Sequence, residues 1–120
     1  MSSIKTFRDL IVWQRGMAIA RAIYGATRAM PRSEAFGLTD QMRRAAVSIP
    51  SNIAEGYARR TRPEYLRSLR IASGSLAELA TQYELAVSIK MLEPDPAIMG
   101  LLAEQDRLLE SLCRKLRNKP

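Results

Sequence analysis

The chain has 120 residues, of which 47% are hydrophobic and 26% are charged. This size and composition predict one folded domain over residues 1–120 and exclude a disordered chain. Nineteen Lys and Arg residues against twelve Asp and Glu residues give a net charge of +7, which suits the binding of a polyanion. The alternative is a basic protein with no nucleic-acid role, because net charge alone does not identify a partner.

Histidine is absent, and Cys113 is the single cysteine. The absence of histidine excludes His-based acid–base chemistry, most zinc sites and the Glu-x-x-His iron sites of helical bundles. One cysteine cannot form a disulfide within the chain and is typical of a reducing compartment. The sequence contains no signal-like segment and no apolar run of the ~20 residues that span a bilayer. We therefore expect a cytoplasmic protein that is not an enzyme, holds no metal or cofactor and does not contact a membrane.

The first predicted helix covers residues 7–30, beginning after the capping-box-like pair Thr6 and Asp9 and ending before Pro31. It carries two apolar stripes: one contains Leu10, Trp13, Met17, Ala20 and Tyr24, and the other contains Val12, Ile19, Ile23 and Met30. A helix of a monomeric bundle needs only one apolar face. The second face favours contact with another subunit. The alternative, a helix buried on all sides, is difficult to build in so small a domain.

The second predicted helix covers residues 38–58, and its apolar face continues through Pro50. Proline inside a helix costs ~3 kcal/mol, so the pattern allows either one kinked helix or two short helices. The apolar phase does not slip at Pro50, which favours the kinked helix. In the preceding connection, residues 31–36, we expect Phe36 to fold back onto the bundle.

A polar stripe lies beside the apolar face of this helix, and it consists of Gln41, Arg44, Ser48, Asn52, Glu55 and Arg59. One interpretation is a solvent-exposed shoulder. The other is a partly buried hydrogen-bonded network in which Arg44 and Glu55 have partners on a neighbouring helix, because a buried charge without a partner is costly. A more distant alternative is a small-molecule pocket at this stripe.

Thr61 and Asp95 are capping residues close to a proline, and each opens a predicted helix, the first over residues 63–91 and the second over residues 96–117. The earlier of these two helices has an apolar seam and, opposite it, a face that contains Gly74. That glycine is either tolerated in the helix or permits the close approach of another chain. The last helix has a single apolar face, so we expect it to lie away from subunit contacts.

Several runs of residues resemble the four-helix bundle family of 23S rRNA intervening-sequence proteins. They are QMRRAAVSIPSNIAEG at residues 41–56, the preceding FGLT, the downstream IASGSLAEL and the upstream FRDLIVWQRG. The accessory protein of diversity-generating retroelements belongs to the same group. The resemblance implies an antiparallel bundle that assembles into a homopentamer and has no enzymatic activity. The biochemical role of most members is unknown, whereas the retroelement accessory protein binds nucleic acid and its reverse transcriptase through a basic surface.

The basic residues are distributed unevenly along the sequence. Residues 1–32 contain six Lys or Arg and one Asp, whereas residues 93–120 contain five basic and five acidic residues. We therefore expect the basic excess on the first helix and on the link of residues 59–62, and not on the last helix. The candidate nucleic-acid contacts are Arg15, Arg21, Arg28, Arg59, Arg60, Arg62, Arg67 and Arg70.

The predicted fold is an all-α, up-down-up-down four-helix bundle that forms a homo-oligomer, a pentamer by resemblance, through its first and third helices. We expect this oligomer to bind RNA or DNA through phosphate contacts without base specificity. The alternative is a protein-interaction scaffold for a reverse transcriptase or another operon product. The sequence shows no RNA-binding module and no aromatic platform on which bases stack.

Overall fold

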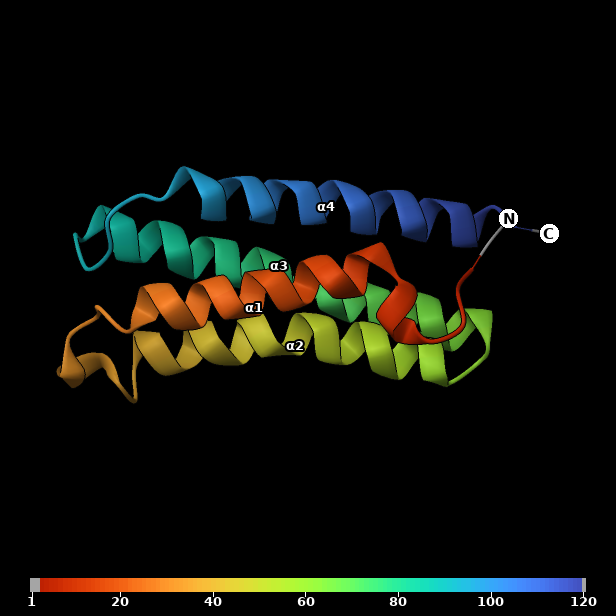
Figure 1. Cartoon of the computed structure of the whole chain (residues 1–120), viewed down its shortest axis with the longest axis horizontal. Coiled ribbons are helices and arrows are strands. Elements are labelled where there is room, and N and C mark those ends of the chain that lie inside the picture. The colour runs from red at the N-terminus through yellow and green to blue at the C-terminus, as the bar shows by residue number, and fades with distance from the viewer. Residues whose placement is uncertain (1–2, 120) are drawn as a thin grey trace.

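The computed structural model describes residues 3–119, so residues 1, 2 and 120 of the predicted domain lie outside the described part. It contains the helices α1 Ile11–Thr27, α2 Leu38–Ala58, α3 Arg62–Ser88 and α4 Pro96–Arg117, with two 3₁₀ turns at Phe7–Asp9 and Arg32–Glu34. The helices lie side by side along the long axis of a molecule that measures 49 × 25 × 21 Å (Figure 1). α2 packs against α1 and α3, and α4 packs against α3 and α1. The prediction of an all-α fold with four helices is confirmed.

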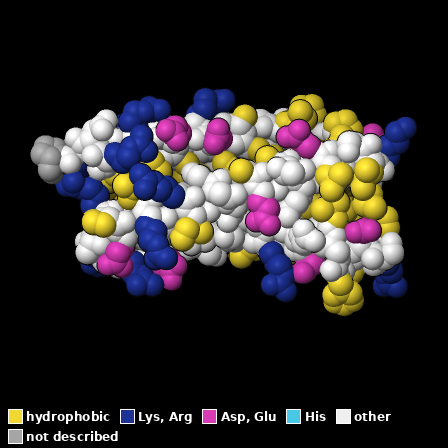
Figure 2. Space-filling view, turned by 180° about the vertical axis from the view of Figure 1, so that it is seen from behind, with side chains coloured by type: hydrophobic (Ala, Val, Ile, Leu, Met, Phe, Trp, Pro, Cys, Tyr) yellow, Lys and Arg dark blue, Asp and Glu magenta, His cyan; other side chains and the backbone are white. Residues whose placement is uncertain are grey.

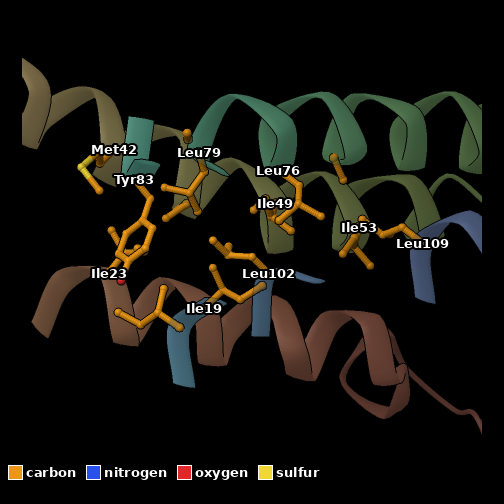
Figure 3. Packing of buried hydrophobic residues seen from close by; sticks show 14 of the residues in the cluster. Ile19, Ile23, Met42, Ile49, Ile53, Leu76, Leu79, Tyr83, Leu102 and Leu109 are labelled. Atoms are coloured by element: carbon orange, nitrogen blue, oxygen red, sulfur yellow. The ribbon is translucent and has the colours of Figure 1, made fainter. Parts of the chain in front are cut away.

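The hydrophobic core receives side chains from all four helices, as Figure 3 shows. The labelled core residues are Ile19, Ile23, Met42, Ile49, Ile53, Leu76, Leu79, Tyr83, Leu102 and Leu109. Of the two apolar stripes on the first helix, the one that contains Ile19 and Ile23 is fully buried, whereas Tyr24 of the other stripe is 41% exposed. The two stripes therefore have different environments, and the first one packs inside the chain.

The start of the first helix differs from the prediction. The capping box at Thr6 and Asp9 is present, and the Asp9 carboxylate accepts the N–H of Thr6 at 3.1 Å. It closes only a 3₁₀ turn, because Leu10 is extended (φ −75°, ψ 130°) and separates that turn from the helix. α1 therefore begins at Ile11 and not at residue 7.

The end of the first helix also comes earlier than residue 30. α1 ends at Thr27, and the following N–H groups close shorter turns, such as the one from Met30 to the carbonyl of Thr27 at 3.1 Å. Pro31 explains this end, because proline has no N–H to continue the helix and disfavours a helical conformation in the residue before it.

The third helix ends at Ser88, three residues before the predicted end at residue 91. Lys90 has a left-handed backbone (φ 67°), and the N–H of Met91 donates to the carbonyl of Ala86 at 2.8 Å. In such a turn, the left-handed residue that follows the helix is usually glycine. Lysine at this position gives no signal of a helix end in the sequence.

α2 runs without a break through Pro50, so the alternative of two short helices is wrong. Pro50 is buried, and a Cβ added at Gly16 of α1 would lie 3.3 Å from its Cβ. The side-chain amide of Asn52 donates to the carbonyl of Ser48 at 2.8 Å. The helix therefore tolerates proline at a position where α1 packs closely against it.

Phe36 does not fold back onto the bundle. Its side chain is 98% exposed in the connection between α1 and α2, which contradicts the prediction.

Among residues 3–119, we find no helix with both the length and the apolar character needed to span a bilayer.

Candidate functional site

The candidate site is the end of the molecule where α2 passes into α3 and where α4 ends. Figure 2 shows Lys and Arg side chains gathered at this end, which is also the end that holds both chain termini in Figure 1. The exposed basic residues that these segments contribute, here called the basic end, are Arg59, Arg60, Arg62, Arg67, Arg70, Arg114, Lys115, Arg117 and Lys119. They come from three separate stretches of the sequence that the fold brings together.

A hydrogen bond joins the end of the chain to the start of α3. The Arg62 guanidinium donates to the backbone carbonyl of Lys119 at 2.8 Å. Arg70 of α3 and Arg117 of α4 also act on the same thiol: burial first, and then Glu110, raise the pKa of Cys113, and these two arginines oppose the rise. Positive charge from α4 therefore adds to that of α3.

Some guanidinium groups at the basic end have carboxylate partners. Arg59 lies 3.4 Å from the Glu55 carboxylate and 3.6 Å from that of Glu64, and Arg114 lies 3.8 Å from that of Glu110. Within residues 3–119, no ion pair forms at Arg60, Arg67, Arg70 or Arg117. These four side chains therefore remain available for an external anion. The exposed ion pairs of Arg59 and Arg114 contribute little to stability.

A shallow pocket of about 390 Å³ lies within the basic end. Its lining consists of Tyr57, Arg60, Thr61, Arg62, Tyr65, Leu116 and Lys119. The rings of Tyr57 and Tyr65 meet edge to face with their centroids 5.7 Å apart. The fold thus places an aromatic pair beside cationic groups, although the sequence pattern shows no such platform.

Tyr65 and Arg60 have unusual environments in this pocket. Burial of Tyr65, with smaller contributions from Tyr57 and Cys113, raises its pKa to about 12, and its hydroxyl is buried without a hydrogen-bond partner in the described part of the chain. Arg60 has a left-handed backbone (φ 66°), a conformation that favours glycine. The arginine side chain is therefore present despite a backbone that disfavours it.

The candidate arginines of the first helix lie apart from the basic end. Arg15 is half-buried, and its Nε atom lies 2.8 Å from the Glu104 carboxylate of α4. Arg21 is exposed further along α1, and Arg28 follows the end of that helix, at the opposite end of the molecule in Figure 1. The structure therefore brings together Arg59, Arg60, Arg62, Arg67 and Arg70 but not Arg15, Arg21 and Arg28.

The prediction that the last helix carries no basic excess is wrong for its final turn, where Arg114, Lys115 and Arg117 are found. Sequence reasoning missed these residues because the charge was summed over residues 93–120. The acidic residues of that stretch fall mostly in its first half and the basic residues in its second half. A shorter window would have given the signal.

The polar stripe of α2 is divided between two environments. At its centre the hydroxyl groups of Ser48 and Ser75 lie 2.9 Å apart, which connects α2 to α3. Near its start Gln82 of α3 donates to the side-chain carbonyl of Gln41 at 3.5 Å. The interpretation of a partly buried network therefore fits the stripe at Ser48 and Asn52, whereas Gln41 is exposed.

Arg44 and Glu55 differ from that interpretation, because each pairs with its own helix and not with a neighbour. Arg44 lies 2.8 Å from the Asp40 carboxylate, and Glu55 pairs with Arg59. Both side chains are exposed, so these parts of the stripe form a solvated shoulder.

In the described residues, no group of three Cys, Asp or Glu side chains is placed to share a metal ion.

The chain was compared with protein families and with curated proteins. A family model described as 23S rRNA-intervening sequence protein matches residues 8–113. A comparison with curated proteins finds no match. The matched range contains α1, α2, α3 and most of α4, and it ends just before the basic last turn of α4. Because the match covers nearly the whole chain, the protein belongs to the family of 23S rRNA-intervening sequence proteins.

Proposed function

We propose that this protein is a non-enzymatic, cytoplasmic subunit of a homo-oligomer that binds RNA or DNA through its basic end. The main support is the convergence of exposed basic side chains from the α2–α3 link, the first half of α3 and the end of α4. A concentrated positive field of this kind attracts the phosphate backbone and releases its counterions.

Phosphate is the part of a nucleic acid that these side chains fit. Guanidinium groups bind phosphate oxygens in a bidentate manner, and Arg60, Arg67 and Arg70 have no carboxylate within the described residues that competes for them. Phosphate contacts position a protein on a nucleic acid but carry no sequence information. We therefore propose binding without base specificity, to RNA, DNA or both.

The oligomer is proposed as a ring of antiparallel, up-down-up-down four-helix bundles, with five copies by resemblance to the family and to the retroelement accessory protein. Exposed large apolar side chains on several elements support self-association. They include Ile11, Tyr24, Phe36, Val47, Ile71, Leu85, Ile89 and Met99. A ring would repeat the basic end around its axis and strengthen the field that a polyanion meets.

The alternative function is a protein-interaction scaffold for a reverse transcriptase or another operon product. The same exposed apolar residues support it, because they also suit contact with a different protein. Nuclease treatment separates the two functions: a scaffold keeps its protein partner after the nucleic acid is digested.

Two double variants test the proposed function by fluorescence anisotropy with labelled RNA and DNA of unrelated sequences at about 50 mM salt. Arg67→Gln/Arg70→Gln removes two exposed charges from the basic end, and Arg21→Gln/Arg107→Gln removes two from outside it. We expect the first variant to weaken binding about tenfold or more, because each lost phosphate contact removes counterion release, and the second to weaken it much less. Absence of binding by the unmodified protein, or equal binding by the first variant, would contradict the function.

A further inference from the structure

Phe36 lies on an ordered loop that presents its ring to solvent. Its side chain is 98% exposed. The loop before it is held by the 3₁₀ turn Arg32–Glu34 and by a bond from the N–H of Gly37 to the carbonyl of Glu34 at 2.9 Å. Within one chain this ring gains nothing from burial, so removal of the ring from water would favour contact with another surface.

A groove of about 680 Å³ lies between α3 and α4. Its apolar lining includes Leu76, Ala80, Tyr83, Val87, Met99 and Leu102. Met99 is 53% exposed, and Leu85 and Ile89 on the neighbouring surface are 48% and 49% exposed. Figure 2 shows apolar side chains gathered at this end, opposite the basic end. We call the cavity with this lining the α3–α4 groove.

The charges of the loop and of the groove are complementary. Glu84 and Asp106 are the ionisable side chains that line the α3–α4 groove besides Tyr83. The loop of residues 28–37 carries Arg28 and Arg32, both exposed. Its one acidic side chain, Glu34, is occupied, because its carboxylate accepts the N–H of Leu38 at 3.1 Å. A cationic loop with an aromatic ring thus matches an apolar groove with acidic walls.

The positions of the two features allow contact between copies. The α1–α2 loop and the half of α3 and α4 that forms the groove lie at the same end of the molecule, away from both chain termini (Figure 1). In the order in which the helices pack, the α1–α2 pair and the α3–α4 pair form opposite edges. A chain therefore cannot fill its own groove with its own loop, whereas a neighbouring copy at the same level along the axis can.

We propose that Phe36 of one copy docks in the α3–α4 groove of the next copy, with the arginines of its loop facing Glu84 and Asp106. The inference rests on the homo-oligomer of the proposed function and names the surface that builds it. It departs from the expectation that the last helix lies away from subunit contacts, because Met99 and Leu102 of α4 line the groove. This contact uses two different patches, so copies lie side by side and close into a ring if the rotation between them allows it. All basic ends then lie on one rim of that ring.

The first test measures the mass of the assembly by sedimentation or light scattering. Phe36→Ala removes the docking ring at a site that contributes nothing to the core, and Ala103→Arg places a cation in the acidic groove from an exposed position. Each is expected to weaken association about tenfold or more, as loss of a central aromatic anchor does. Ile71→Ala is the matched control, because it truncates a 44% exposed apolar side chain outside the loop and the groove.

The second test is cross-linking between two separately made chains, one with Ala35→Cys, which keeps the Phe36 ring beside an exposed position, and one with Met99→Cys in the groove. Oxidation of the mixture should give a mixed dimer that neither variant gives alone, since the loop and the groove meet only across copies. The natural Cys113 interferes little, because it is buried and its pKa is raised.

The outcomes separate this inference from the proposed function. If the unmodified protein is an oligomer and Phe36→Ala and Ala103→Arg leave it intact, or if only Ile71→Ala disrupts it, the docking site is wrong while the proposed oligomer stands. If the unmodified protein is a monomer at micromolar concentration, the oligomer and the docking site are both wrong. A mixed cross-linked dimer together with dissociation of both variants supports the docking site.

Discussion

A Cβ added at Gly56 of α2 would overlap the Cβ of Ser68 on α3 and lie 2.9 Å from its hydroxyl oxygen. The two helices therefore approach more closely here than any side chain at Gly56 allows. Gly74 on the outward face of α3 is a contrasting case, because a Cβ added there meets nothing within 4 Å. The two glycines of this helix pair thus have opposite roles, and each leads to a clear expectation.

Gly56→Ala should destabilise the protein by about 1–3 kcal/mol, since Ser68 has no long side chain to move aside and the helices must separate. Gly74→Ala should stabilise it by roughly 1 kcal/mol, because alanine favours the helix and fits the open space. Urea unfolding of both variants measures the difference. Equal stability of Gly56→Ala and the unmodified protein would show that the close approach is absent.

Gly74→Ala also tests an interpretation made from the sequence, in which this glycine permits the approach of another chain. Docking of Phe36 in the α3–α4 groove predicts no change of assembly in this variant. Loss of the oligomer would instead place a subunit contact on the outward face of α3.

Tyr65→Phe should leave the protein equally stable or more stable by about 1 kcal/mol, because the hydroxyl is buried without a partner in the described residues. The pKa of this tyrosine is raised by burial to about 12 in the folded protein. The unfolded chain ionises first, so stability is present below the ordinary pKa of tyrosine, about 10, and decreases as the pH rises from there through the folded-state value.

Urea unfolding of the unmodified protein and of Tyr65→Phe at neutral pH and near pH 11 checks this expectation. The unmodified protein should lose more stability at high pH than the variant does. A variant that is less stable by more than 1 kcal/mol at neutral pH would indicate that the hydroxyl has a partner.

Arg60→Gly should separate folding from binding. Glycine adopts the left-handed conformation of Arg60 (φ 66°) without strain, so stability should be unchanged or higher by up to about 1 kcal/mol. Loss of the guanidinium from the basic end should weaken RNA binding about threefold or more. Lys90→Gly is the matched control, because Lys90 has the same backbone conformation (φ 67°) at the opposite end of the molecule. Equal RNA affinity of the two variants would exclude Arg60 as a contact.

Asn52→Ala and Glu55→Gln should differ although both residues belong to the same polar stripe. The Asn52 side chain donates to the carbonyl of Ser48 at 2.8 Å and to its hydroxyl at 2.9 Å in a partly buried position, so its loss should cost about 1 kcal/mol. Glu55 makes an exposed pair with Arg59, whose loss should cost less than about 0.5 kcal/mol. Thermal unfolding compares them, and a larger effect of Glu55→Gln would reverse the assignment.

Where the chain carries local signals, the sequence predicts the helices well. The bounds of α2 and α4 agree with the predicted ranges 38–58 and 96–117, and Asp95 caps α4 by accepting the N–H of Ala97 at 2.9 Å. The predicted ends fail where a residue acts against its usual preference. Lys90 takes the place of glycine after α3, and Leu10 is extended although the predicted apolar stripe of the first helix begins with it.

The candidate site is harder to predict because it depends on contacts between distant segments. Nothing in the sequence indicates that Arg62 bonds to Lys119, or that Tyr57 and Tyr65 meet beside them. Arg15 shows the opposite limit: its place in the basic first helix made it a candidate, but the Glu104 carboxylate of α4 lies 2.8 Å from its Nε atom. Pairing across helices decides which arginines are available, and only the fold shows it.

The most direct test of the basic end is the salt dependence of RNA binding, measured for the unmodified protein and for Arg67→Gln/Arg70→Gln. The logarithm of the association constant should fall linearly with the logarithm of salt concentration, with a slope that is shallower by about 2 in the variant, because two phosphate contacts are lost. Identical slopes for the two proteins, or affinity that does not change with salt, would contradict phosphate binding at this end of the molecule.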